Sequence, residues 1–307
     1  MVGSDHRLQH LGDGLLLGGR QRLDALQLLR DLRLRPALAG AAQVTDAVLE
    51  EARVWQTRPL EAIYPIVWLD GIMVKVQQNK QVINKSAHVV LGVNLRGEKD
   101  VLGLWLAENE GATFWLAVLT ELRQRGVQDI DISSMDGLKG LPEAVNAVFP
   151  KTLTQLCIVH LVRASLRHVS STDGKAVVAA LKAICQSTTV EEALRELDRL
   201  EEAWGAKYKA VVRLWRGNWD NIIPFFQFLS ETRKVIYTTN AIESLNMVMR
   251  KYTRNRRIFP NDDSALKWLF LAIREASKSW KSIHHWKAAL QSFQVMFGEE
   301  RVPLAAL

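Results

Sequence analysis

Three apolar segments separated by short polar turns stand out in the first third of the chain. They are residues 64–76 (YPIVWLDGIMVKV), 82–95 and 100–107, and the turns between them read QQNKQ and RGEK. Connections this short join antiparallel neighbours, because parallel strands need a long crossover. The pattern therefore predicts an antiparallel three-stranded meander.

The apolar positions then change to an alternation of helix and strand. In order, the predicted elements are a helix over 113–125, a strand near 127–132, a helix over 141–148 and a strand over 153–159. From Val162 to about Arg233 the pattern is helical throughout. Three antiparallel strands followed by helix, strand, helix and strand predict a mixed α/β fold.

The N-terminal part of the chain has a different composition. Residues 1–42 are rich in Leu, Arg and Gly and contain no Phe, Trp or Tyr. This composition predicts an atypical N-terminal arm, which is either disordered or the product of a wrongly assigned start of the gene. Helices are expected from about Arg20 to Leu34 and from Val44 to Thr57. The predicted parts are 1–42, a β-rich part over 43–161, a helical insertion over 162–235, and a basic helical region over 236–307.

Asp70 lies inside the apolar segment 64–76, where a buried carboxylate needs a partner. Asp-Gly between apolar runs is a strong hairpin signal, and Asp70-Gly71 fits it. The runs on either side are continuous rather than alternating, which instead favours one central strand covered on both faces. The local pattern leaves both interpretations open.

Charge and cysteine content narrow the class of protein. The 307 residues carry a net charge of +7 with a pI near 9.5, which favours an anionic partner such as nucleic acid. Cys157 and Cys185 cannot form a disulfide scaffold, so a reducing compartment, the cytoplasm, is expected. No apolar run approaches the roughly 20 residues of a membrane span.

Two further acids stand at the ends of predicted elements. Asp136-Gly137 follows the fourth strand and fits an ordinary turn, and Asn240-x-x-Glu243 fits a capping box at a helix start. If these acids converged with Asp70, they would repel one another unless divalent cations lay between them. Two such cations can activate a water or hydroxyl and stabilise the leaving oxygen of a phosphodiester.

Four stretches carry a family resemblance. They are YPIVWLDGIMVKV, SSMDGLKGLPEAV, QLCIVHLVRASL and TTNAIESLNMVMRKYTRNRRIFP. From about Val44 to Trp280 the chain resembles the mutator-type transposases of bacterial insertion sequences. The resemblance implies a ribonuclease-H-like catalytic core, beginning with residues 43–161, that is interrupted by an all-helical insertion.

By position, the resemblance makes Asp70, Asp136 and Glu243 the three acids of a DDE triad. It implies that they are the catalytic residues and that they hold Mg²⁺ or Mn²⁺, two ions per site. The implied activity is cleavage of DNA at element ends and joining of the 3′-hydroxyl to target DNA. The resemblance also favours the central strand over the hairpin at Asp70-Gly71.

The family's Cys-x-x-His pair is matched by Cys157 and His160. A zinc site needs four ligands, and His168 and Cys185 could supply the other two. The favoured interpretation makes Cys157 a buried strand residue and places His160 near the site, where it orients a carboxylate or phosphate. Asn240 is a further auxiliary residue.

Basic residues follow Glu243 closely. They are Arg250, Lys251, Arg254, Arg256 and Arg257. For any one of them a solvated helix face is the simpler interpretation. As a cluster directly after a catalytic acid, they suit phosphate contacts along a DNA end.

The sequence departs from the family at its front, where members carry a helical DNA-binding region with a helix-turn-helix. Residues 1–42 do not look like that region, so the prediction is an N-terminally truncated transposase. Its expected partners are the terminal inverted repeats of the element, target DNA and further copies of the chain on DNA. The alternatives are a non-catalytic DNA-binding remnant and a ribonuclease-H-like nuclease without strand transfer.

Overall fold

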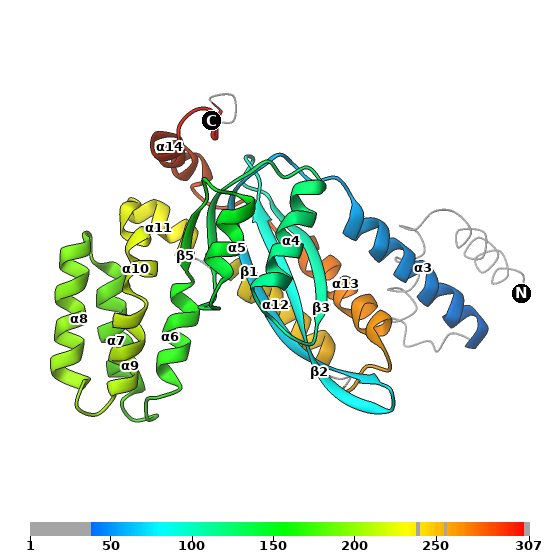
Figure 1. The fold of residues 1–307 in the computed structure, drawn as a ribbon, viewed down its shortest axis with the longest axis horizontal. Helices are drawn as coiled ribbons and strands as arrows, with labels where there is room; N and C mark the ends of the chain where they lie inside the picture. The colour runs from blue at the N-terminus through cyan, green and yellow to red at the C-terminus, as the bar shows by residue number, and fades with distance from the viewer. Residues whose placement is uncertain (1–37, 238–239, 255–256, 304–307) are drawn as a thin grey trace, which may run out of the picture.

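The computed structural model describes residues 38–237, 240–254 and 257–303 (Figure 1). The helix expected from Arg20 to Leu34 and most of the predicted arm lie outside the described residues. The helix expected from Val44 is present and begins earlier, as α3 (Leu38–Thr57).

Five strands form one mixed sheet in the order β3-β2-β1-β4-β5. Their bounds are β1 (Ile63–Gln78), β2 (Gln81–Val93), β3 (Lys99–Ala107), β4 (Asp129–Met135) and β5 (Leu153–Leu156). The first three pair antiparallel, whereas β4 pairs parallel with β1 and β5 pairs parallel with β4. The predicted meander and the mixed α/β class are confirmed.

The central strand β1 runs without a break through Asp70 and Gly71. Asp70 pairs with Val89 and Gly71 pairs with His88, and the chain reverses only at Asn79 and Lys80, both of which have positive φ. A hairpin at Asp70-Gly71 is therefore wrong, and the polar stretch after β1 is the turn.

The apolar run of β1 is continuous because the strand packs against two separate hydrophobic cores, one on each face. Ile66 and Trp68 belong to a cluster shared with one set of helices, whereas Val67 and Leu69 belong to a cluster shared with another set. The first set is α12 (Asn240–Arg254), α13 (Asp262–Lys278) and α14 (Trp286–Phe297), and the second is α4 (Ala112–Gln124) and α5 (Leu141–Val148). Both faces of the strand are buried, so alternation disappears.

The fifth strand was expected to reach Val159, but it ends at Leu156. Its parallel partner β4 ends at Met135, which pairs with Leu156, so no ladder partner remains beyond that point. Cys157 is the extended N-cap of helix α6 (Ile158–Leu166). The expected strand thus includes the first residues of a helix, and β4 in turn runs to Met135 rather than ending near 132.

Between β5 and α12 the described chain is helical. After α6 come α7 (Gly174–Gln186), α8 (Val190–Trp204), α9 (Lys209–Gly217), α10 (Trp219–Ile222), the 3₁₀ helix η1 (Ile223–Gln227) and α11 (Ser230–Tyr237). Figure 1 shows α6 to α10 standing to the left of the sheet. Their own core includes Trp215, which is fully buried and whose Nε1 donates to Ser165 Oγ at 2.9 Å.

Within the described residues, none of the helices combines the length and the apolar character that a membrane crossing requires.

Candidate active site

The carboxylate of Asp70 lies in the middle of β1 and is only 8% exposed. Its Oδ1 accepts a hydrogen bond from the backbone N–H of Gly71 at 2.8 Å, and its Oδ2 accepts one from Nδ2 of Asn246 on α12. Nε2 of His160 on α6 lies 3.5 Å from the same Oδ2. The two hydrogen-bond donors, with the imidazole of His160 beside them, are the partners that a buried carboxylate needs.

Asp136 lies next to Asp70 because of the register of two parallel strands. Leu69 of β1 pairs with Met135 of β4, so the residues that follow them stand side by side. Burial, together with the negative charges of Glu110 and Asp70 and against the effect of His160, raises the pKa of Asp136 to about 6. The two acids therefore share one region of the molecule.

Glu243 comes to the same region from the first turn of α12. Its side chain is 15% exposed, and its Oε1 lies 2.9 Å from Nη1 of Arg163 on α6. One turn further along α12, Asn246 contacts Asp70. Helix α12 therefore carries one acid of the predicted triad and a donor to another.

The thiol of Cys157 provides a second sign that the acids are close. Burial, with added contributions from the charges of Asp70 and Glu243, raises its pKa to about 11. Cys157 is buried as predicted, although at a helix N-terminus instead of in a strand. His160 follows on the first turn of α6 and faces Asp70.

A zinc centre with His168 and Cys185 does not form. Both cysteines are free thiols, and His168 is exposed. Across residues 38–237, 240–254 and 257–303, no three His, Cys, Asp or Glu side chains are grouped so that they could hold a metal ion.

The donor set of the three acids nevertheless fits Mg²⁺ or Mn²⁺ in kind, because hard divalent cations prefer carboxylate oxygens. One oxygen of Asp70 accepts a hydrogen bond from Asn246, and Oε1 of Glu243 lies beside the guanidinium of Arg163 without hydrogen-bond geometry.

Sequence reasoning missed a fourth carboxylate, that of Glu110, between β3 and α4. Its Oε1 accepts a hydrogen bond from Nε1 of Trp115 at 3.0 Å and lies 3.5 Å from Nδ1 of His88. Burial raises the pKa of Glu110, and the charge of Asp70 raises it further. The available signal was His88, a lone ionisable residue inside the apolar stretch of β2.

His88 is completely buried, and neither of its ring nitrogens has a hydrogen-bond partner. Burial lowers its pKa to about 4, against an opposing effect of the Asp70 charge. At neutral pH the imidazole is therefore uncharged beside two acids.

Arg163 and Asn246 were also missed. Each lies three residues after a predicted site residue on the same helix, His160 and Glu243 respectively. Residues three apart on a helix lie on the same side, so this spacing was the signal that could have found them.

The basic residues after Glu243 are only partly described. Arg250, Lys251 and Arg254 are exposed on α12, and Arg257 is exposed beyond it. Arg256 lies outside the described residues, and so does the side chain of Asn240. Intervals of seven and four residues put Glu243, Arg250 and Arg254 on one side of α12.

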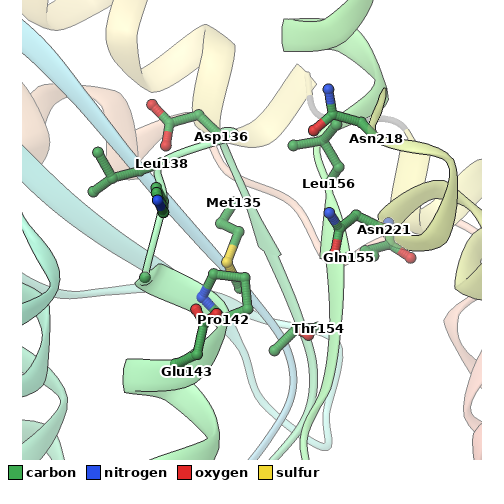
Figure 2. Close-up of a pocket in the computed structure, with 13 residues that line it drawn as sticks. Met135, Asp136, Leu138, Pro142, Glu143, Thr154, Gln155, Leu156, Asn218 and Asn221 are labelled. Carbon is green, nitrogen blue, oxygen red and sulfur yellow. The ribbon is translucent and has the colours of Figure 1, made fainter. Parts of the chain in front are cut away.

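A pocket of about 300 Å³ opens beside Asp136 (Figure 2). It is lined by the end of β4, the start of α5, strand β5 and the connection between α9 and α10. The pocket therefore lies between the sheet and the helical segment.

Comparison with known proteins identifies the family of this chain. The family described as "Transposase, Mutator family" matches residues 38–283. The chain belongs to the Mutator family of transposases. The resemblance seen in the four sequence stretches is confirmed.

Named relatives agree with this assignment. A transposase for insertion sequence element ISRM3 from Rhizobium meliloti is 48% identical over 276 residues, which cover 89% of this chain and 68% of the relative. A probable transposase from Corynebacterium diphtheriae is 50% identical over 231 residues, or 75% of this chain and 67% of the relative. The transposase of IS256 in transposon Tn4001 from Staphylococcus aureus is 28% identical over 243 residues, or 78% and 62%.

Proposed function

We propose that this chain cuts DNA at the ends of an insertion sequence and joins the 3′-hydroxyl to target DNA, with Asp70, Asp136 and Glu243 as a DDE triad. One observation carries the proposal. Asp136 directly follows the parallel neighbour of the strand that carries Asp70, and helix α12, whose Asn246 donates to Asp70, carries Glu243 more than a hundred positions later. The alternative function is that of a nuclease with the same fold, which cleaves DNA without joining it. Such a nuclease would give cleaved DNA but no joined product, which distinguishes it from a transposase.

The proposed fold of the core is ribonuclease-H-like. A sheet with three antiparallel strands, followed by two parallel strands on the side of β1, supports it. In this sheet the central strand carries the first acid, and the second acid directly follows the last residue of its parallel neighbour β4.

The three acids would hold Mg²⁺ or Mn²⁺, and a bound ion supplies activation of the attacking oxygen and stabilisation of the leaving oxygen. The remaining residues position the acids. His160 contacts Asp70, while Arg163 contacts Glu243 from the same helix, so α6 orients two acids at once. Arg163 is half exposed and carries the charge that a phosphate would bind.

The DNA would run along α12. Arg250 and Arg254 are exposed on the side of the helix that carries Glu243, and the chain is basic overall. Lysine and arginine contacts to phosphates position a strand without reading its sequence. We therefore propose that this side of α12 guides a DNA end to the acids. Copies of the chain would assemble on that DNA end.

Glu243→Gln tests the proposal, with Glu202→Gln on α8 as the matched control, since Glu202 is exposed and distant in sequence from every predicted site residue. The assay follows cleavage and joining of pre-cut element ends in Mg²⁺ or Mn²⁺. Because activation by a bound ion contributes several kcal/mol, Glu243→Gln should lose about 100-fold or more while the control keeps its activity.

Equal activity of the wild type and Glu243→Gln, independent of metal, would show that the triad is wrong. Cleavage without joined product would favour the nuclease. If the wild type neither cleaves nor gains thermal stability from Mn²⁺, the non-catalytic alternative holds.

A further inference from the structure

The pocket beside Asp136 has the size of a small ligand site. Its volume of about 300 Å³ stands at the lower end of the roughly 300–1,000 Å³ common for such sites. Figure 2 shows Asp136 at one rim, Pro142 and Glu143 on one side, and Gln155, Asn218 and Asn221 together on the other. Since Asp136 also belongs to the acid site, a group in this pocket would lie beside the chemistry.

Gln155 indicates that the pocket is built for a ligand. Its side chain is 4% exposed and lines the pocket, yet its Oε1 is buried without a hydrogen-bond partner. A buried acceptor left unpaired costs roughly 1–3 kcal/mol, and native proteins keep few of them. Rotation of the Gln155 amide would bring this oxygen to the pocket, where a donor from outside the chain would satisfy it.

Two asparagines extend the same polar wall. Nδ2 of Asn218 donates to the carbonyl of Leu214 at 2.8 Å, which leaves its Oδ1 as an acceptor. Asn221 is exposed on α10 and lines the pocket as well. Three carboxamides offer donors and acceptors together, which is how asparagine and glutamine bind the edges of nucleobases.

The other residues that line the pocket argue against a phosphate group as its ligand. Its charged residues are Asp136 and Glu143 against Lys139, so acids outnumber cations. Met135, Pro142 and Leu156 supply apolar surface, against which the face of a planar ring can pack. An uncharged heteroaromatic ring with polar edges fits these walls.

Building on the proposed function, we propose that this pocket receives an unpaired nucleobase of the DNA strand whose phosphodiester lies at the three acids. Taking a base out of the stack costs a few kcal/mol, least where the strand is already single. Hydrogen bonds to Gln155, Asn218 and Asn221 would offset that cost. The bound base would also fix the register of the strand relative to Asp136.

The test uses the full chain with EDTA, so that binding is seen without cleavage. The probe is a DNA duplex with a short 3′ overhang of thymines, in which 2-aminopurine occupies one overhang position at a time. Fluorescence anisotropy reports binding of the duplex, and 2-aminopurine emission reports the environment of the single base. The variants are Gln155→Leu and Asn221→Leu, with Asn146→Leu as control because Asn146 is exposed on α5 and absent from the pocket lining.

On the wild type, emission at one overhang position should rise several-fold, since the lining holds no aromatic ring to quench it. Both pocket variants should lose most of that rise and bind the overhang up to about tenfold more weakly, whereas Asn146→Leu behaves as the wild type. Gln155→Leu should melt at the same or a higher temperature, because it removes an unsatisfied acceptor.

An equal rise in all variants, with binding intact by anisotropy, would overturn the pocket assignment and leave the proposed function standing. A melting-temperature increase with free deoxynucleoside monophosphates that depends on Gln155, without any DNA signal, would assign the pocket to a free nucleotide and overturn the strand assignment. Failure of the wild type to bind the duplex would overturn both proposals.

Discussion

At the scale of single residues, Asp70 decides how the site is arranged. A carboxylate inside a central strand is tolerated because the backbone N–H of Gly71 and the Asn246 amide donate hydrogen bonds to it, while the His160 ring lies 3.5 Å away. Charge-assisted hydrogen bonds of this kind are about twice as strong as neutral ones. The cost of burying the charge is thus met by residues of β1, α6 and α12 together.

Asn246→Ala should destabilise the metal-free protein by about 1.5–3 kcal/mol, because the buried carboxylate loses a donor. Adding Asp70→Asn should recover part of that loss, since the charge that needs the donor is then gone. Urea unfolding in EDTA of both single variants and the double variant measures the coupling. Additive effects would show that the contact with Asp70 contributes nothing.

At the scale of elements, strand β4 is held at its far end by the C-terminal part of the chain. The guanidinium of Arg301 donates to both carboxylate oxygens of Asp129 at 2.7 and 3.0 Å and to the carbonyls of Ile130 and Lys151. Asp131 is completely buried beside it, with Oδ1 3.0 Å from Nε of Arg301 but outside hydrogen-bond geometry. The strand that leads to Asp136 therefore begins at a buried charge cluster.

Asp131 should make stability depend on pH. Burial raises its pKa to about 7, against an opposing effect of Arg301, whereas an unfolded Asp titrates near 3.9. The folded state therefore binds this proton more tightly, so its contribution to stability is present at low pH and is lost as the pH rises through about 7. The difference in unfolding free energy between wild type and Asp131→Asn should change by on the order of 2 kcal/mol between pH 5 and 8, in favour of the variant at pH 8.

Urea titrations of both proteins at several pH values in that window provide the measurement. Other acids titrate in both proteins alike, so the comparison isolates Asp131. A constant difference across the window would mean that Arg301 keeps this carboxyl ionised in the folded state.

At the scale of the whole molecule, the helices between β5 and α12 have a core of their own around Trp215, while their first helix supplies His160 and Arg163 to the acids. The sheet has two other cores, one on each face. Separate cores allow separate local unfolding. The division of the chain into a catalytic core and a helical insertion stays a prediction.

Trp215→Ala tests that division. Removing a fully buried Trp costs about 3–5 kcal/mol, and Ser165 loses the donor of its 2.9 Å hydrogen bond. Hydrogen exchange should show faster opening in residues 174–227 and unchanged protection in β1 and β4. Trp219→Ala, at a partly buried position of the same core, should show a smaller change of the same kind. Equal loss of protection in the sheet would show that the two parts unfold as one.

The sequence by itself determined the elements and the family. Helices, strands and the turn after β1 follow from periodicity and turn residues, which act between near neighbours in the chain. The positions of Asp70, Asp136 and Glu243 followed from motifs whose family is shown by comparison, while their catalytic role remains a proposal.

Only the tertiary structure decided what surrounds those acids. Asp70-Gly71 is a good turn locally, but β1 pairs on both edges and packs on both faces, and a side chain at Gly71 would stand 2.8 Å from Ser86 Oγ. Asn246, Arg163 and Glu110 reach the site from three distant segments, and Oε1 of Gln155 on β5 is buried without a hydrogen-bond partner. Hydrogen bonding and desolvation depend on distances in space that no local pattern encodes, so these contacts could be found only in the folded chain.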